Sequence, residues 1–583
     1  MAHFGYHGKY LHIPLGDVAN ATPIPLSETT LRKSVGGVGL GAHLLLQENA
    51  PEQDAFDSPL AFVFSPLVGS PITTSAKFAV VCKSPLTDRF NDALASSGFA
   101  IRGKATGHDA LLITGKASRP SILVIDNEEV RLETAEEVWG KSTTQTESIL
   151  RRQFGSEFDF AVIGPAGENR VRFASLSHDG RHAGRGGTGA VLGAKRIKAI
   201  AVRGTKKCMW FNPTGLSEFA KALSQKSFGP ATAKYRELGT ASNLLAFNRL
   251  RTLPTRNFQQ STFEAAESLA PETLVETREK TRASCRSCTI GCEHLYSLGG
   301  DQKKVRLEYE NLFALGPLCG VSDSQAVLAA SQRCDELGID TISAGGTIAF
   351  AMECVERELL EEPWLQFGSG EAVLRAIEMI ATRLDICDQM AEGTRRFAEQ
   401  IGGEAPRFAS HVKGMEIPGY EPRSLQTMAL GFAVGARGAD HNRSSAYEVD
   451  FSEQANRHQI STNAVSLAAA AEDRAVLLDT LILCKFLRRV FDDIWTESAN
   501  MLQLVTGWDM SAEELKEVIH RIINAKKQFN IQCGWSPAED TLPDRFFDDD
   551  LPETSNRVSR EQLKQAIREY NRQRGWTDDG FIE

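Results

Sequence analysis

The stretch Cys285-Arg-Ser-Cys288-Thr-Ile-Gly-Cys292 holds three cysteines, separated by two residues and then by three. This spacing lets one short loop point three thiols at a single centre. A cubane 4Fe–4S cluster needs four thiolate ligands, so a fourth must come from another part of the chain. The candidate is Cys484, in Asp479-Thr-Leu-Ile-Leu-Cys484. The pattern therefore predicts a fold that brings two distant segments together.

Two other interpretations of these cysteines stay open on spacing alone. Four thiolates also build a structural zinc site. Cysteines without a metal commonly serve as small buried hydrophobic residues. The radical-SAM pattern does not fit, because its gaps occur in the opposite order.

Composition sets the class of protein. The 583 residues are enough for two to four domains, and 42% hydrophobic with 24% charged residues is ordinary for a globular protein. The formal net charge of −10 argues against a nucleic-acid partner, because phosphate binding requires clustered positive charge. A local basic patch for an acidic electron carrier remains compatible with this total.

The chain is expected to lie in the cytoplasm, away from membranes. Residues 1–9 lack the apolar core of a signal peptide. No apolar run approaches the roughly 20 residues that a membrane span needs. The 11 cysteines are an odd number and form no secreted disulfide framework, which favours a reducing compartment.

Residues 1–208 are predicted to be a β-rich domain. Short apolar runs recur there between glycine and proline residues, as strands require. A helix is predicted over 135–154, with Thr134 as its N-cap and Gly155 at its end. The runs span residues 10–14, 61–64, 78–82, 110–114, 122–125, 160–163 and 199–202.

Residues 209–413 and 414–583 are predicted to be two mainly helical domains, giving an α+β fold. The second boundary lies at the Gly- and Pro-containing segment 414–423. Ser322 and Ser343 are the expected N-caps of two successive helices, and Gly338 the expected end of the first.

A glycine-rich turn offers a candidate anion site. Gly184-Arg-Gly-Gly-Thr-Gly189 precedes a possible helix, and Arg185 with free helix N–H groups would bind a phosphate. A tight turn packed in the interior is the alternative. Residues 36–41 lack the strict G-x-G-x-x-G pattern and the context of a dinucleotide site.

Two acidic motifs resemble each other: Asp335-Glu-Leu-Gly338-Ile-Asp340 and the Asp479 stretch. A carboxylate at a helix end can accept two N–H bonds from a heterocycle such as a pterin, although a solvent-facing acid is the plainer interpretation. Glu310 and His441 form a natural pair for proton transfer near neutral pH, and either alone could be structural.

Taken together, the chain resembles the aldehyde ferredoxin oxidoreductase family over nearly its whole length. Members hold tungsten, or sometimes molybdenum, on two pterin dithiolenes beside a 4Fe–4S cluster. Besides the cysteine and acidic motifs, the resemblance rests on Gly5-Tyr-His-Gly-Lys9, Ser84-Pro-Leu-Thr87, Gly107-His-Asp109, Ile163-Gly-Pro-Ala-Gly-Glu168, Ala183-Gly-Arg-Gly-Gly187, Glu308-Tyr-Glu310, Glu416-Ile-Pro418, Arg437-Gly-Ala-Asp-His441, Thr506-Gly-Trp-Asp509 and Asp540-Thr-Leu-Pro543.

The resemblance implies a role for each candidate residue. Glu310 and His441 would lie near the metal and carry protons. The remaining expected roles are cluster ligation by Cys285, Cys288, Cys292 and Cys484, contact with one pterin by Asp335, Gly338 and Asp340, contact with the other by Asp479 and Leu483, cover of the pterin phosphates and a bridging magnesium by Arg185, Gly186 and Gly187, and a basic side chain near the cluster from Lys77.

The chain departs from the family pattern at several positions. Lys77 stands where an arginine is usual, and Ile482 where a glycine is usual. The family tends to have a glycine at position 88, an asparagine at 94 and a pair of glycines at 96 and 97, and the asparagine is a ligand on the magnesium and phosphate side. The residues present are Asp88, Leu94, Ser96 and Ser97.

The implied activity is oxidation of an aldehyde to a carboxylic acid, with water supplying the oxygen. Electrons would pass through the cluster to ferredoxin or a partner subunit, in a homodimer or hetero-oligomer. Two alternatives stay open: the same cofactors reducing a carboxylic acid or thioester, and a non-enzymatic protein stabilised by metal.

Overall fold

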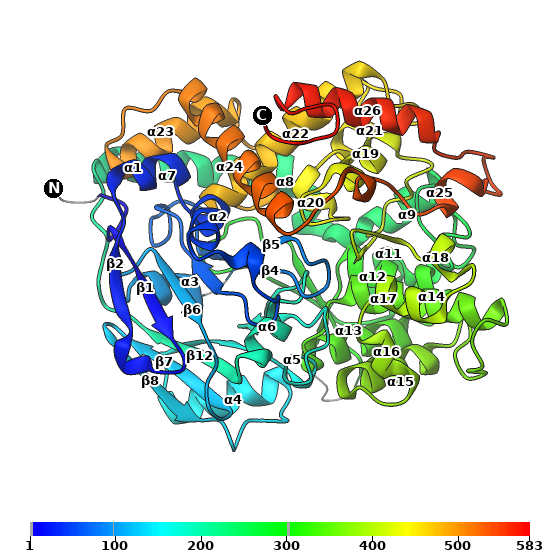
Figure 1. Cartoon of the computed structure of the whole chain (residues 1–583), viewed down its shortest axis with the longest axis horizontal. Coiled ribbons are helices and arrows are strands. Elements are labelled where there is room, and N and C mark those ends of the chain that lie inside the picture. The colour runs from blue at the N-terminus through cyan, green and yellow to red at the C-terminus, as the bar shows by residue number, and fades with distance from the viewer. Residues whose placement is uncertain (1–3, 97, 300–303) are drawn as a thin grey trace.

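The computed structural model describes residues 4–96, 98–299 and 304–583 and has an α+β fold. Two six-stranded sheets lie between residues 9 and 203, and most of the chain after residue 203 is helical. The predicted fold class is confirmed (Figure 1). Ser97 and residues 1–3 of the N-terminal stretch lie outside the described residues.

The first sheet carries the site at its β5 edge. Strands β1 and β6 run parallel and the other neighbours are antiparallel. All four side chains of β3 are buried. In spatial order the strands are β2 (Thr22–Pro25), β1 (Lys9–Pro14), β6 (Ala110–Thr114), β3 (Leu60–Val63), β4 (Lys77–Lys83) and β5 (Phe90–Ser96).

The second sheet shares a hydrophobic core with the first. Helix α3 (Gly98–Lys104) contributes Phe99, whose ring centroid lies 5.0 Å from that of Phe78 and 5.7 Å from that of Phe62. In spatial order the strands are β11 (Arg181–Ala183), β10 (Leu176–His178), β9 (Asp159–Val162), β12 (Ile197–Arg203), β7 (Ser121–Asp126) and β8 (Glu129–Thr134).

The seven apolar runs all coincide with strands, but five further strands of these two sheets had no apolar signal. Strand β5 includes Asn91 and Asp92, residue types that suggest a turn. Both are fully buried in the strand. Strand β8 ends at Thr134, which pairs with Ser121 in the sheet, so Thr134 is not the helix cap that the sequence suggested.

The predicted helix over 135–154 begins later than expected. Helix α4 spans Thr143–Phe154, and Ser142 caps it by a reciprocal capping box with Gln145. The predicted end at Gly155 is confirmed. The capping box satisfies two backbone N–H groups at once, which explains why the helix starts there.

Two other predicted caps were wrong, and a carboxylate replaces a serine in each. Helix α13 (Ser324–Leu337) is capped by Asp323 rather than Ser322, and it ends at left-handed Gly338 as predicted. Helix α14 (Thr341–Glu356) is capped by Asp340 rather than Ser343. The Asp340 carboxylate accepts bonds from the Ile342 N–H at 3.2 Å and the Ser343 hydroxyl at 2.7 Å.

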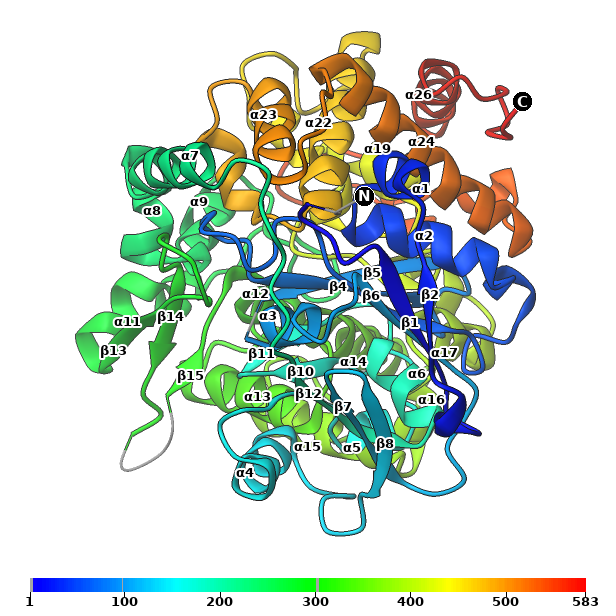
Figure 2. The same ribbon diagram turned by 90° about the vertical axis from the view of Figure 1, so that its left-hand side faces the viewer.

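The cysteine loop is the connection of a β-hairpin. Strands β13 (Lys280–Ala283) and β14 (Glu293–Tyr296) flank it, and β15 (Val305–Arg306) completes a third sheet (Figure 2). Helix α11 (Pro271–Thr277) ends shortly before β13 begins. Antiparallel pairing on both sides fixes where the loop leaves the sheet.

Helices from the last third of the chain pack against the N-terminal domain. Helices α22 (Thr462–Leu481) and α24 (Ala512–Gln532) contact α2 (Gly37–Gln47). A Cβ added to Gly37 would lie 2.3 Å from the carbonyl oxygen of Asp479, and Gly37 has φ +45°. The glycines of residues 36–41 thus permit α2 to approach the end of α22 closely, beside Asp479.

None of the helices in the described part of the chain is both long and apolar enough to cross a bilayer. The two predicted domain boundaries, at residues 208 and 413, stay predictions.

Candidate functional site

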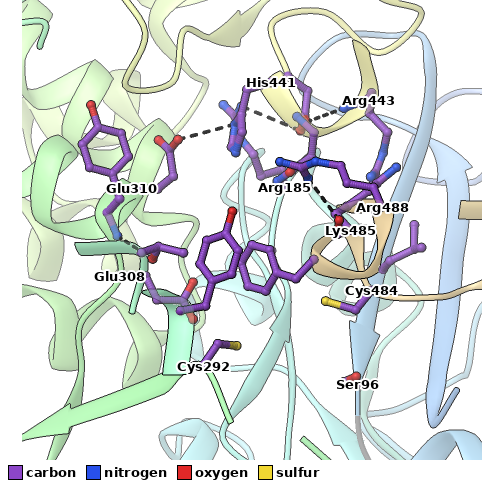
Figure 3. A pocket seen from close by; sticks show the side chains of 18 of the residues that line it. Ser96, Arg185, Cys292, Glu308, Glu310, His441, Arg443, Cys484, Lys485 and Arg488 are labelled. Carbon is purple, nitrogen blue, oxygen red and sulfur yellow. Dashed lines mark hydrogen bonds and ion pairs between the residues drawn. The ribbon is translucent and has the colours of Figure 1, made fainter. Parts of the chain in front are cut away.

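A cavity of about 640 Å³ lies where the β5 edge, the cysteine hairpin and the helices after residue 300 meet (Figure 3). Of the candidate site residues, those in its wall are Lys77, Arg185, Cys285, Cys292, Glu310, His441, Asp479, Leu483 and Cys484. Those outside its wall are Gly186, Gly187, Cys288, Asp335, Gly338 and Asp340.

A second cavity of about 650 Å³ adjoins the first and reaches Asp335. The two cavities share Ser96, Arg181, His182 and Arg306 in their walls. His182 Nε2 lies 3.1 Å from the Asp335 carboxylate. Together they provide two adjoining spaces, one lined by Asp479 and the other by Asp335.

The fourth cysteine follows the end of α22 directly. Ile482 caps that helix in the left-handed conformation, with φ 55° and ψ 47°. A β-branched residue is strained there by roughly 1–2 kcal/mol, and glycine is not. A glycine at this position would adopt the same conformation without that strain. Cys484 then begins the short 3-10 helix η5 (Lys485–Arg489).

Thr74 joins the two cysteine-bearing segments. Its backbone N–H donates to the Ser287 carbonyl at 2.7 Å, and its hydroxyl accepts from the Cys484 N–H at 3.1 Å. Thr74 has φ 67°, which is rare for a β-branched residue. Its neighbour Thr73 accepts a bond from the Thr289 N–H at 3.1 Å. These bonds hold the loop and the distant cysteine together.

The cysteine thiols lie close enough together for their charges to interact. Burial, followed by the nearby Cys484, raises the pKa of Cys288 to about 11. Burial and the other three cysteines also raise the pKa of Cys292 well above its usual value. Within the residues described, no three His, Cys, Asp or Glu side chains are close enough to hold one metal ion.

Glu310 and His441 meet on the cavity wall. Glu310 lies in the first turn of α12 (Tyr309–Leu315), and His441 begins α20 (His441–Ser444). Glu310 Oε1 is 3.5 Å from His441 Nδ1, and neither atom has a hydrogen-bond partner. The Gly419 N–H donates to the other Glu310 oxygen at 3.1 Å.

Burial moves the two pKa values in opposite directions. It raises the pKa of Glu310 to about 8, because the charged carboxylate loses water. It lowers the pKa of His441 to about 4, because the charged imidazolium is disfavoured. At neutral pH the pair therefore holds its proton on the carboxyl group, and the imidazole is neutral.

Arg185 is held by the protein on several sides. Its guanidinium donates to Asp340 at 3.1 Å and to the carbonyl oxygens of Ala439 and Glu416 at 2.7 Å each. Gly186 has φ 84°, and a Cβ there would lie 1.9 Å from Asn91 Oδ1. The turn is packed tightly, and Arg185 is the candidate residue of it that reaches the cavity wall.

Three amides at the start of α6 (Thr188–Ala194), the helix after this turn, are bonded within the protein. The Gly189 N–H donates to the Ala174 carbonyl, and the next two amides donate to the Gly187 carbonyl. These three N–H groups are therefore not free to bind an anion.

Asp479 is neutralised by two cations. Lys485 Nζ lies 2.9 Å from its carboxylate and Arg443 Nη1 lies 3.3 Å away. Arg443 also reaches Asp92 Oδ1 at 3.1 Å. Burial lowers the pKa of Lys485 to about 8. Strand β5 and the second acidic motif are thus tied through Arg443.

Sequence reasoning missed several residues of the site. Arg443 stands two residues after His441, just beyond the quoted stretch that ends there, so its proximity could have been suspected. Thr74 carried no signal, because its role depends on contacts far along the chain. An aromatic wall beside His441 was also missed; it comprises Phe247, Tyr309, Tyr420, Tyr447 and Phe451.

Both parts of the chain match one family. Residues 10–204 match its N-terminal domain, and residues 217–583 match its domains 2 and 3. The chain belongs to the aldehyde ferredoxin oxidoreductase family. It is therefore an oxidoreductase, and the resemblance found in the sequence is confirmed.

Known relatives differ in what their names say they act on. The tungsten-containing aldehyde ferredoxin oxidoreductase of Thermococcus kodakarensis is 34% identical over 99% of this chain and 98% of its own. The aliphatic sulfonate oxidoreductase WOR-like subunit of Pyrococcus furiosus is 26% identical over 99% of this chain and 96% of its own.

A solved structure shares the fold. The active-site complex BamBC of benzoyl coenzyme A reductase, with 1,5-dienoyl-CoA, has a TM-score of 0.85 and 22% identity. The match covers 100% of this chain and 96% of that one.

Proposed function

We propose that this enzyme oxidises an aldehyde to a carboxylic acid at a tungsten bis-pterin centre. Two electrons would leave singly through a 4Fe–4S cluster to a ferredoxin-type carrier or a partner subunit. The observation that carries the proposal is the convergence on one cavity of cysteine-bearing segments, the Asp479 motif and the Glu310–His441 pair. The names of the relatives support tungsten and ferredoxin.

The residues present fit this cofactor set. Buried polar atoms without partners face the cavity, including Arg437 Nε and His441 Nδ1. A polar ligand such as a pterin would satisfy them. The four cysteines supply the number of thiolates that a cubane needs.

The proposed holding residues follow the sequence motifs. Cys285, Cys288, Cys292 and Cys484 would ligate the cluster. Asp335 with Asp340 would contact one pterin and Asp479 the other, with Gly338 and Leu483 beside them. Lys77 would lie near the cluster, and Arg185 with Gly186 and Gly187 beside the pterin phosphates. Molybdenum is the alternative metal of this proposal, because the metal is held by the cofactor's own sulfurs. The proposal also includes a magnesium ion at the pterin phosphates.

The protein's part in the chemistry is to move protons and shape the cavity. The bound cofactor would accept an electron pair and release it one electron at a time. Oxidation of an aldehyde by water also releases two protons. Ionised Glu310 would accept one, and neutral His441 stands 3.5 Å away to accept the next or polarise the carbonyl. The aromatic wall lines the cavity beside this pair.

We further propose a cytoplasmic enzyme that works as a homodimer or with an electron-transfer subunit. The reducing compartment follows from the cysteine content, since the described cysteines form no disulfide.

Reduction of a carboxylic acid or thioester is the second candidate. Leu94 and Ser96, two departures from the family pattern, line the cavity. The sulfonate enzyme and the benzoyl-CoA reductase complex indicate that this fold serves other substrates.

Anaerobic purification with metal analysis and a substrate screen tests the proposal. We expect a brown protein with about four iron atoms and with tungsten per chain. Aldehydes should drive reduction of a viologen dye. A colourless, zinc-only protein would overturn the cofactor assignment. Dye oxidation coupled to acids or thioesters, without aldehyde activity, would favour the second candidate.

A further inference from the structure

The cysteine loop opens to solvent. Ser284, Arg286 and Ser287 are exposed, and Cys285 and Cys288 are only partly buried. A cluster held by these cysteines would therefore approach the surface at this loop. Electron transfer to another protein requires such an approach, so the chemistry of the surrounding surface decides which partner can dock.

Four cations surround the loop, and we name them the basic rim: Lys234, Arg282, Arg286 and Arg489. All four are exposed. Among the described residues none of them makes an ion pair, and Lys234 donates only to the Asn243 side chain, at 2.6 Å. The acids Glu279 and Asp492, which lie nearby in sequence, are paired with Lys304 and Lys226.

The rim residues come from three segments that meet at the cysteines. Arg282 lies on β13, with its Nε 3.4 Å from where a Cβ on Gly291 would be. Arg489 ends η5, five residues after Cys484. Lys234 lies on α8 (Pro230–Leu238), close enough to Arg489 for the two positive charges to interact.

An aromatic contact fixes α8 against the segment of the fourth cysteine. Tyr235 stacks on Phe486, with ring centroids 3.9 Å apart and planes at 14°. Lys280 also donates to the Glu237 carbonyl at 3.1 Å, which ties β13 to α8. Figure 2 shows α8 and β13 on one side of the molecule, away from α26 (Arg560–Gln573). The three segments that carry the basic rim are thus held in fixed positions relative to one another.

We propose that the basic rim is the docking surface for a small acidic iron–sulfur protein that accepts one electron per encounter. This rests on the proposed function and identifies the partner's surface chemistry. The chain as a whole carries −10, which repels an acidic carrier. A local excess of unpaired positive charge reverses that repulsion and steers the carrier to the cluster.

The electron balance requires two encounters per turnover. One aldehyde loses two electrons. At each encounter the cluster is oxidised by one electron and the docked carrier is reduced by one, so two carriers leave reduced. A weak, rapidly exchanging, electrostatically guided contact suits this cycle, because each carrier must leave before the next one binds.

The test uses the full-length, anaerobically loaded enzyme, a strongly acidic ferredoxin and a viologen dye. The variants are Arg282→Glu and Arg489→Glu. The matched control is Lys564→Glu, an exposed lysine on α26. Ferredoxin binding, ferredoxin reduction and dye reduction are measured at low and high salt, and iron content confirms that the cluster is retained.

We expect each rim variant to bind ferredoxin more weakly at low salt. The kcat/KM of the enzyme for ferredoxin should fall by about tenfold. Dye reduction should stay within about twofold of wild type. High salt should bring wild type down towards the variants, because it screens exposed charges. The control should match wild type.

Wild-type ferredoxin binding in both rim variants, or binding that is insensitive to salt, would overturn the proposal and favour an apolar subunit interface. Because binding is measured without turnover, it tests the rim even if no aldehyde is oxidised. Absence of all aldehyde-dependent dye reduction would instead count against the proposed function.

Discussion

Glu310 and His441 are ordinary residues in sequence, and their surroundings make them a pair. Burial removes water from both, which favours the neutral form of each. The carboxyl group therefore keeps a proton at pH 7 that an exposed glutamate would lose. Such opposed shifts are typical of acid–base pairs at active sites.

This arrangement predicts a pH profile. If Glu310 is the base, only its ionised form acts, and a pKa of about 8 leaves about a tenth of it ionised at pH 7. We expect kcat/KM for the aldehyde to rise with pH through about 8. Glu310→Gln should remove that rise and lower kcat by about 10²–10⁴-fold.

The measurement compares the variant with His441→Asn at equal iron and tungsten content. The replacement Glu310→Gln preserves shape, so lost activity would reflect lost proton transfer. Wild-type turnover in both variants would show that neither residue carries protons in the reaction.

At the scale of elements, the site depends on a clamp between a β-hairpin and the end of a helix. Thr74 adopts a strained left-handed conformation while bonding to both cysteine-bearing segments. Such strain persists where the surroundings over-determine the backbone, and it concentrates at functional sites. The hairpin alone could not fix the position of Cys484.

Replacing Thr74 tests the clamp. Thr74→Val keeps the side-chain shape but removes the acceptor for the Cys484 N–H, which costs about 1–3 kcal/mol. We expect fewer iron atoms per chain and a changed EPR spectrum of the reduced cluster. Thr74→Ser keeps the hydroxyl and should retain both properties. Equal iron content and equal spectra in both variants would remove Thr74 from cluster positioning.

At the scale of the whole molecule, Asp540 ties the end of the chain to its middle. Its carboxylate lies 2.7 Å from Lys413 Nζ and 3.6 Å from Lys527 Nζ. All three residues are buried. Lys527 also lies over the ring of Trp535, 3.1 Å from its centroid. The carboxylate therefore compensates buried positive charge.

Asp540→Asn should destabilise the whole protein. Removing one partner leaves buried ammonium charge without a counter-ion, which costs about 3–5 kcal/mol. We expect a clearly lower unfolding temperature of the loaded enzyme by calorimetry. The control Asp579→Asn changes an exposed carboxylate and should shift stability by no more than about 0.5 kcal/mol. Equal unfolding temperatures would show that Lys413 is neutral or solvated.

The fold class, the family and the position of several strands and helix ends could be predicted from the sequence. The seven apolar runs coincide with strands, and two helices end at Gly155 and Gly338 as predicted. These signals could be read from the sequence because hydrophobic periodicity and helix-ending glycines depend on only a few neighbouring residues. The strand that contains Asn91 and Asp92 was not predicted. These polar residues are buried because they contact residues far along the chain, such as Arg185 and Arg443.

How the motifs are arranged around the site depends on contacts that the sequence does not reveal. The Thr74 clamp, the opposed pKa values of Glu310 and His441, and the basic rim all arise from contacts between residues far apart in the chain. Desolvation and charge depend on what surrounds a group in three dimensions. No local sequence pattern carries that information. The sequence therefore indicated which residue types take part, and the fold determines how they are placed relative to one another.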